Sequence, residues 1–100
     1  MADSLTKELE RLLVRWHYEP TLLPHQLEHY IEHVFSLLPD ADREAVLSYY
    51  GVLGREQLSL HEIAAAHSLP DEEMLSRIDR SVRRIAVTPE WQSLIKTKDA

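Results

Sequence analysis

The sequence contains no cysteine and only two glycines among its 100 residues. The absence of cysteine excludes disulfides, thiol catalysis and the cysteine-containing zinc sites. The shortage of glycine leaves no glycine-rich loop that could cradle a phosphate group, and no cofactor is predicted. Because nothing else in the pattern indicates a pocket with converging catalytic groups, we expect a binding protein rather than an enzyme.

Long hydrophobic runs are also missing. The chain begins Met-Ala-Asp-Ser, without a basic segment followed by an apolar stretch long enough for export or for a membrane span. We therefore expect a cytoplasmic protein with no membrane association. Hydrophobic residues at 44% and charged residues at 28% are typical of globular proteins, and the length suits a single domain with one core.

Basic residues are outnumbered, and the formal net charge is -6. Residues 1–42 carry eight acidic and three basic side chains, a net of -5, whereas residues 43–100 carry nine acidic and eight basic ones, a net of -1. Because phosphate repels an acidic chain, this balance disfavours tight, general binding of nucleic acid.

Apolar residues recur at helical spacing throughout, and no strand pattern is found. The spacing predicts helices over residues 4–18, from Pro24 to about Leu38, over residues 43–50, in a short segment from about Leu60, over residues 71–86, and after Thr88. The predicted fold class is therefore all-α, a compact bundle of about six short helices in a single domain, with an acidic N-terminal helical hairpin over residues 1–39.

The same periodicity predicts the core. Both tryptophans, Trp16 and Trp91, are expected to be buried. The apolar sides of the second, fifth and last helices are predicted to bury Leu27, Tyr30, Ile31, Val34, Phe35, Leu38, Met74, Leu75, Ile78, Val82, Ile85, Leu94 and Ile95.

Several residues mark helix ends. Gly51 is placed to end the third helix in a left-handed conformation. Asp40 or Asp42 is expected to cap the start of that helix. Ser59 and Glu62 have the spacing of a capping box, which fixes the start of the fourth helix near Leu60.

The stretch YGVLGREQLSLHEI, residues 50–63, resembles the fourth conserved region of bacterial sigma factors. The resemblance extends over about residues 43–86 and implies a helix-turn-helix, with its turn at residues 68–70, inside a unit that spans residues 40–96. In that family the region reads promoter DNA and docks on RNA polymerase.

Four arginines on the second helix of this motif are the main candidate contact residues: Arg77, Arg80, Arg83 and Arg84. Ser59 and His61, at the start of the first helix, complete the candidate set. In the family, the first turn of the second helix reads the bases of DNA. Here that turn is Asp71-Glu72-Glu73, and its three carboxylates would be repelled by the negatively charged DNA.

These features predict a free-standing module that acts in transcription or its regulation. Its expected partner is RNA polymerase or another transcription protein, with at most weak DNA binding by the chain alone. The alternative is a protein-interaction module, or an oligomerisation module that binds further copies of itself, on the same type of fold and with no DNA contact.

Three histidines, His25, His29 and His33, repeat every four residues, a spacing that lets two imidazoles on one helix share a metal ion. They lie opposite the apolar side of their helix, with Glu28 and Glu32 between them. We interpret them as a solvent-exposed polar face, and no metal site is predicted.

Overall fold

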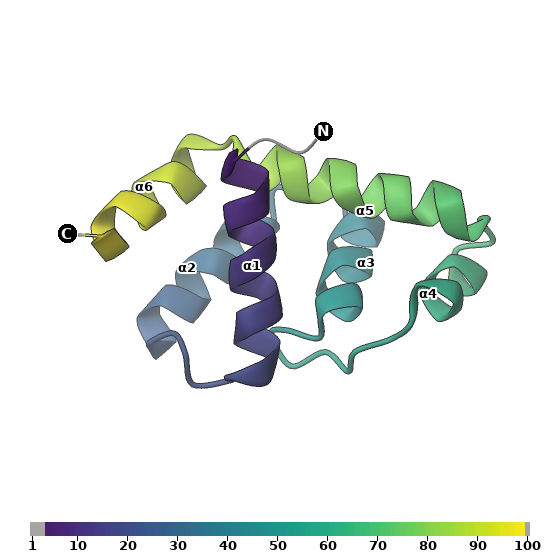
Figure 1. Ribbon diagram of the computed structural model, residues 1–100, viewed down its shortest axis with the longest axis horizontal. Coiled ribbons are helices and arrows are strands. Elements are labelled where there is room, and N and C mark those ends of the chain that lie inside the picture. The colour runs from purple at the N-terminus through teal and green to yellow at the C-terminus, as the bar shows by residue number, and fades with distance from the viewer. Residues whose placement is uncertain (1–3, 100) are drawn as a thin grey trace.

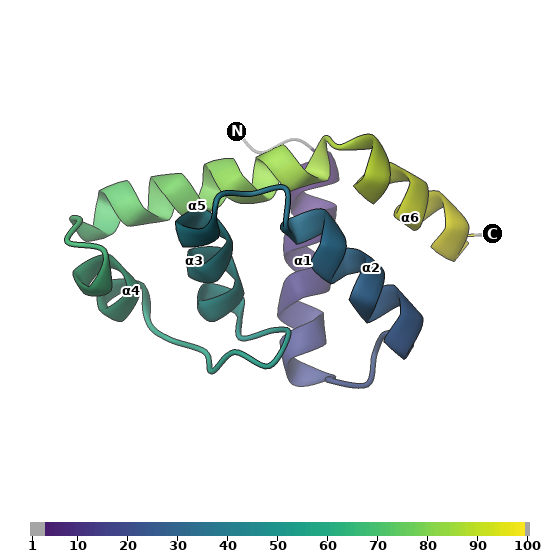
Figure 2. The same ribbon diagram turned by 180° about the vertical axis from the view of Figure 1, so that it is seen from behind.

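The computed structural model describes the backbone of residues 4–99 and the side chains of residues 4–94. This part of the chain contains no strand and forms six helices: α1 (Ser4–Tyr18), α2 (His25–Phe35), α3 (Asp40–Tyr50), α4 (Leu60–Ala66), α5 (Asp71–Ala86) and α6 (Pro89–Asp99). The predicted all-α class is confirmed. In Figures 1 and 2, α5 lies along one side of the molecule, with α1, α3 and α4 beneath it and α2 and α6 at the end away from α4.

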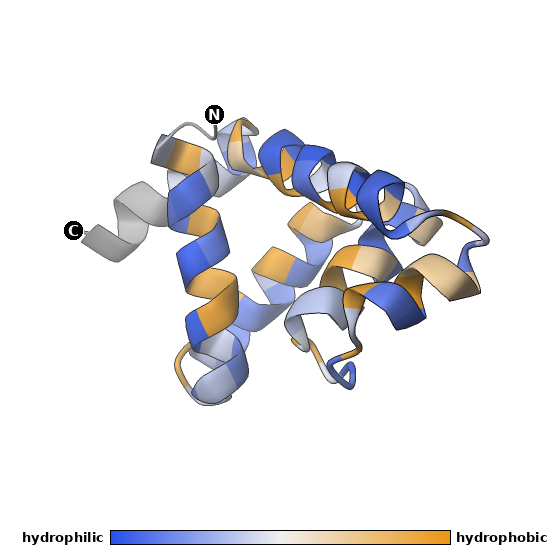
Figure 3. Cartoon of the chain, turned by 45° about the vertical axis from the view of Figure 1, so that its right-hand side comes forward, coloured by the Kyte–Doolittle hydropathy of each residue, from blue (hydrophilic) through white to orange (hydrophobic). Residues whose placement is uncertain are grey.

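One cluster of buried side chains extends from Leu9 in α1 to Trp91 in α6. Helix α5 contacts α1, α3, α4 and α6, and is hydrophobic on its inner side and hydrophilic outside (Figure 3). Trp16 and Trp91 retain only 4% and 2% of their exposure, so their predicted burial is confirmed. The side chain of Ile95 lies outside the described residues.

Local sequence signals set several helix ends as predicted. Gly51 follows α3 with a φ of 67°, and its N–H donates to the Leu47 carbonyl at 2.8 Å. The Ser59 hydroxyl accepts from the Glu62 N–H at 3.1 Å, while the Glu62 carboxylate accepts from the Ser59 N–H at 3.2 Å. This reciprocal pair satisfies amides that a helix start otherwise leaves unbonded, and α4 begins at Leu60.

The connection between α4 and α5 ends α4 in an unusual way. The N–H groups of Leu69 and Ser68 donate to the carbonyls of Ala64 and Ala65, the two hydrogen bonds of a Schellman motif. Ser68 occupies the left-handed position with a φ of 57°, where glycine is the usual residue.

Two predicted helix boundaries are wrong. Helix α2 ends at Phe35 rather than Leu38, because the next residues form tighter i→i−3 turns that bring Leu38 into the core. Helix α3 begins at Asp40, directly after Pro39, and no side chain caps it. The expected caps form ion pairs instead: Asp40 with Arg43 at 3.2 Å, and Asp42 with Arg77 at 3.1 Å.

Two residues assigned to the core are exposed. Tyr30 is 38% exposed, and its hydroxyl donates to the Glu90 carbonyl at 3.3 Å across the α2–α6 contact. Leu75 is 36% exposed because it lies at the margin of the buried stripe of α5. Helical periodicity predicts the direction in which a side chain points. Whether that side chain is buried depends on whether a neighbouring helix covers it.

Candidate partner-binding surfaces

From its middle to its C-terminal end, α5 carries a basic surface, which we call the arginine face: Arg77, Arg80, Arg83 and Arg84. Arg80, Arg83 and Arg84 are exposed, and Arg77 is half-buried. A hollow of about 270 Å³ lies along this face, lined by Asp42, Arg77, Arg80, Ser81 and Arg84. Three of the predicted contact residues therefore surround one concave surface.

Asp42 changes the charge of this surface. Its Oδ1 lies 3.1 Å from Arg77 Nη2, and the two side chains are only 20% and 37% exposed. The carboxylate partly neutralises Arg77, so that Arg80 and Arg84 supply most of the positive charge around the hollow. Sequence reasoning missed this residue because the pair joins α3 to α5, and no local pattern indicates it.

The N-terminal end of α5 has the opposite charge. Asp71, Glu72 and Glu73 are all exposed in its first turn. His61 Nδ1, from the start of α4, lies 3.1 Å from Asp71 Oδ1. His61 is thus bound to the acidic end of α5 and does not line the hollow of the arginine face.

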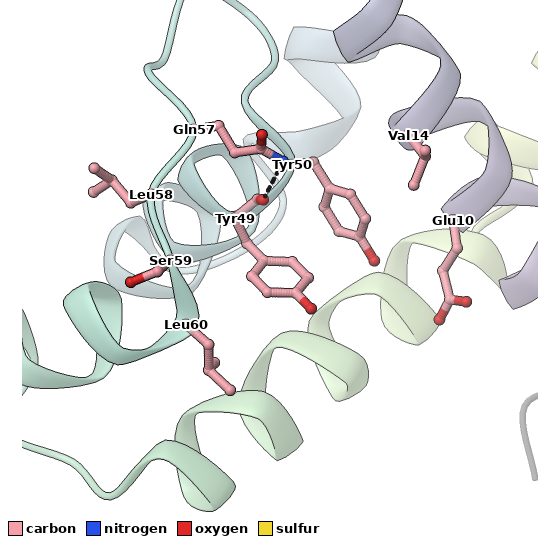
Figure 4. Close-up of a pocket in the computed structure, with 8 residues that line it drawn as sticks. All are labelled: Glu10, Val14, Tyr49, Tyr50, Gln57, Leu58, Ser59 and Leu60. Carbon is pink, nitrogen blue, oxygen red and sulfur yellow. Dashed lines mark hydrogen bonds between the residues drawn. The ribbon is translucent and has the colours of Figure 1, made fainter.

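A second concave surface, which we call the tyrosine groove, lies between α1, the end of α3 and the segment before α4 (Figure 4). Its volume is about 560 Å³, and its walls are formed by Glu10, Val14, Tyr49, Tyr50, Gln57, Leu58, Ser59 and Leu60. Ser59 was the only member of this set among the predicted contact residues, and its hydroxyl also caps α4.

The wall formed by residues 57–60 is held against α3 by two hydrogen bonds to carbonyl groups of that helix. Leu58 N–H donates to the Ser48 carbonyl at 2.9 Å, and Gln57 Nε2 donates to the Tyr49 carbonyl at 3.4 Å. The sequence gives no direct signal for the groove, because the groove depends on the path of an irregular segment.

The turn at residues 52–55, which leads into residues 57–60, is also held in place by hydrogen bonds. Arg55 N–H donates to the Val52 carbonyl at 3.1 Å, across Leu53 and Gly54, which have φ values of 54° and 80°. The Arg55 guanidinium donates to Glu44 Oε2 at 2.7 Å and to the Leu53 carbonyl at 2.8 Å. A charge-assisted contact therefore ties the loop to α3.

Tyr50 is the most perturbed titratable group described in the structure. It is 8% exposed, and burial, followed by the negative charges of Glu10, Tyr49 and Asp79, raises the pKa of its hydroxyl far above the ordinary value of 10.0. The Tyr50 hydroxyl therefore stays protonated to a higher pH than that of an ordinary tyrosine, and carboxylates from α1 and α5 lie near enough for their charges to act on it.

His25, His29 and His33 are exposed, as predicted. The Nε2 atoms of His25 and His29 are 3.1 Å apart, close enough for one imidazole to donate a hydrogen bond to the other. Among the residues that the structure describes, no three histidine or acidic side chains are arranged to hold a metal ion. None of the described helices combines the length and apolar character needed to cross a bilayer.

Comparison with protein-family models, with curated proteins and with solved structures finds no match for this chain.

Proposed function

We propose that this chain is a free-standing module resembling region 4 of sigma factors, which acts in transcription or its regulation by binding RNA polymerase or a regulatory protein. The observation that carries the proposal is the exposed arginine face, with Arg80 and Arg84 beside a hollow. The left-handed Gly51 and the capping box of Ser59 and Glu62 support it, since both fall within the resembling segment.

An acidic protein surface is the ligand we favour for the arginine face. Guanidinium groups bind carboxylates in pairs of parallel hydrogen bonds, and a hollow lined by several of them suits an acidic protrusion. DNA suits the surface less well, because the acidic first turn of α5 stands where the sigma family reads bases.

DNA binding by the chain alone should be weak and salt-sensitive. If Arg80, Arg83 and Arg84 each neutralise one phosphate, the slope of log affinity against log salt is about -2.7, which means a loss of about 40-fold between about 50 mM and about 200 mM salt. A gel-shift titration at physiological salt that gave nanomolar, sequence-selective binding would contradict this expectation.

Affinity capture with the tagged chain tests the main proposal. RNA polymerase, or one defined transcription protein, should be retained after nuclease treatment of the extract. The double substitution Arg80→Glu with Arg84→Glu should abolish retention, while Lys7→Glu with Arg11→Glu on α1, which changes the net charge equally, should not. Retention that disappears with nuclease, or that survives the α5 substitutions, would overturn the proposal.

The alternative function, a protein-interaction or oligomerisation module with no DNA contact, is favoured by a different observation. Val14 and Tyr18 of α1 are 47% and 75% exposed, and Val14 also lines the tyrosine groove. Capture of a partner that is unaffected by the α5 substitutions, without any transcription protein, would favour this alternative.

A further inference from the structure

The tyrosine groove has one carboxylate in its wall, that of Glu10, and Asp79 lies outside the lining but acts on Tyr50. Glu10 of α1 and Asp79 of α5 form no ion pair with any residue of the described part of the chain. Both carboxylates nevertheless lie close enough to Tyr50 for their charges to act on its hydroxyl. Arg11 and Arg15 line a neighbouring hollow that shares Glu10 and Val14 with the groove, but Arg15 pairs with Glu19, and neither arginine forms an ion pair with Glu10 among the described residues. The Glu10 carboxylate therefore keeps its hydrogen-bonding capacity for a ligand.

The aromatic side chains of the groove face the same region. The rings of Tyr49 and Tyr50 pack edge to face with centroids 5.1 Å apart. In Figure 4 both hydroxyls point toward the side of the groove on which Glu10 lies, while Val14 and Leu60 stand at its margins. The groove therefore suits a planar cation that is carried by an apolar segment. Its carboxylate and its two phenols suit the cation, and its flanking apolar side chains suit the rest of the segment.

We propose that the tyrosine groove binds an arginine side chain of a protein partner, presented by a segment with apolar residues on either side. The guanidinium donates to the Glu10 carboxylate and lies against the half-buried ring of Tyr49, and the apolar neighbours cover Val14 and Leu60. This inference is separate from the arginine face, and it holds whether or not the chain acts in transcription.

The groove is preorganised for such a ligand. Residues 57–60 are fixed by the hydrogen bonds to Ser48 and Tyr49 and by the capping box at Ser59. Little ordering is then required on binding, which favours affinity for a short segment. A second copy of the chain is a poor occupant, because two molecules that each carry a net charge of -6 repel one another.

The probe for the test is the blocked peptide acetyl-Leu-Arg-Leu-amide, and its neutral control has citrulline in place of arginine. Amide chemical shifts of the ¹⁵N-labelled chain are followed during titration. We expect saturable shifts at Glu10, Val14, Tyr49 and Ser59. The citrulline peptide should bind about tenfold more weakly, because it lacks the charge that Glu10 attracts.

Two substitutions that each remove one negative charge distinguish binding in the groove from general electrostatic attraction. Glu10→Gln should weaken binding of the arginine peptide about tenfold, whereas Glu8→Gln, on the same helix but outside the groove, should leave binding unchanged. Equal binding of the citrulline peptide, shifts confined to residues 71–73, an equal effect of the two substitutions, or no saturable shift up to about 10 mM peptide would each overturn the proposal. Self-association that Glu10→Gln abolishes would also overturn it, since the occupant would then be a second copy.

Discussion

Alanine substitutions at Gly51 and Gly54 should have clearly different effects on stability, although both glycines have positive φ. The φ values are 67° at Gly51 and 80° at Gly54, so either alanine incurs the left-handed conformational cost of about 1–2 kcal/mol. Alanine also restricts the unfolded chain, which offsets about 0.4–1 kcal/mol in both variants. The difference between the two free energies of unfolding is therefore free of these shared contributions.

Only Gly51 lacks room for a side chain. A Cβ atom there would lie 2.7 Å from both Gln57 Cβ and His17 Nδ1, whereas ordinary contact begins at 3.4 Å, so the neighbours must move by 3.4 minus 2.7, or 0.7 Å. Moving Gln57 Cβ requires a backbone shift, and overpacking of this kind costs about 1–3 kcal/mol. Moving His17 breaks its 3.0 Å hydrogen bond to the Gly51 carbonyl, at about 0.5–1.5 kcal/mol. At Gly54 no atom lies within 4 Å.

Gly51→Ala should consequently lower the free energy of unfolding by about 1.5–4.5 kcal/mol more than Gly54→Ala does. Urea unfolding followed by far-ultraviolet circular dichroism measures both values, with an unchanged m-value as the check that the same cooperative transition is observed. If the two variants differed by less than about 0.5 kcal/mol, the close approach of residues 17, 51 and 57 would be refuted.

Four further outcomes are expected. Ile63→Ala removes a side chain that is 2% exposed between α4 and α5, and should cost about 2–5 kcal/mol in thermal or urea unfolding; a melting curve like that of the parent would contradict the packing of α4. Ser68→Gly should raise the free energy of unfolding by about 1 kcal/mol, because glycine adopts the φ of 57° without strain; a loss of stability would be inconsistent with that conformation. The folded-state pKa of Tyr50 is raised above its ordinary value of 10.0, so the contribution of this group to the free energy of unfolding is complete below pH 10 and is lost as pH rises. Between about pH 10 and about pH 12, the free energy of unfolding should therefore fall by about 1.4 kcal/mol per pH unit more in the parent than in Tyr50→Phe. Parallel plots of stability against pH for the two proteins would rule this out. Zinc should bind His25 and His29 more weakly than about 1 μM, because within residues 4–94 only two ring nitrogens converge there. Calorimetry that showed stoichiometric, submicromolar binding would overturn this expectation.

The features that sequence predicted well are those decided by a few adjacent residues. The Ser59–Glu62 capping box and the left-handed Gly51 each depend on a single turn of chain. The strongly periodic helices α1 and α5 were likewise predicted with their observed bounds. Local chemistry and helical periodicity are sufficient for these elements.

The features that sequence missed depend on residues far apart in the chain. Tyr30 was assigned to the core because its helix position faces inward, yet its exposure is set by where α6 passes. Asp42 was expected to cap α3, and its actual partner, Arg77, is on another helix. The tyrosine groove likewise requires α1 and residues 57–60 to meet beside α3, an arrangement that no single segment encodes.

Charge on the two concave surfaces distinguishes between classes of partner. The arginine face offers positive charge beside one hollow, and the tyrosine groove offers the carboxylate of Glu10 beside another. A nucleic acid is uniformly anionic, so it would match the first surface and be repelled by the second and by the acidic first turn of α5. A protein surface carries both signs of charge and apolar residues together, and can therefore match both surfaces at once. The protein partner proposed above therefore fits the charge of the two surfaces better than a nucleic acid does.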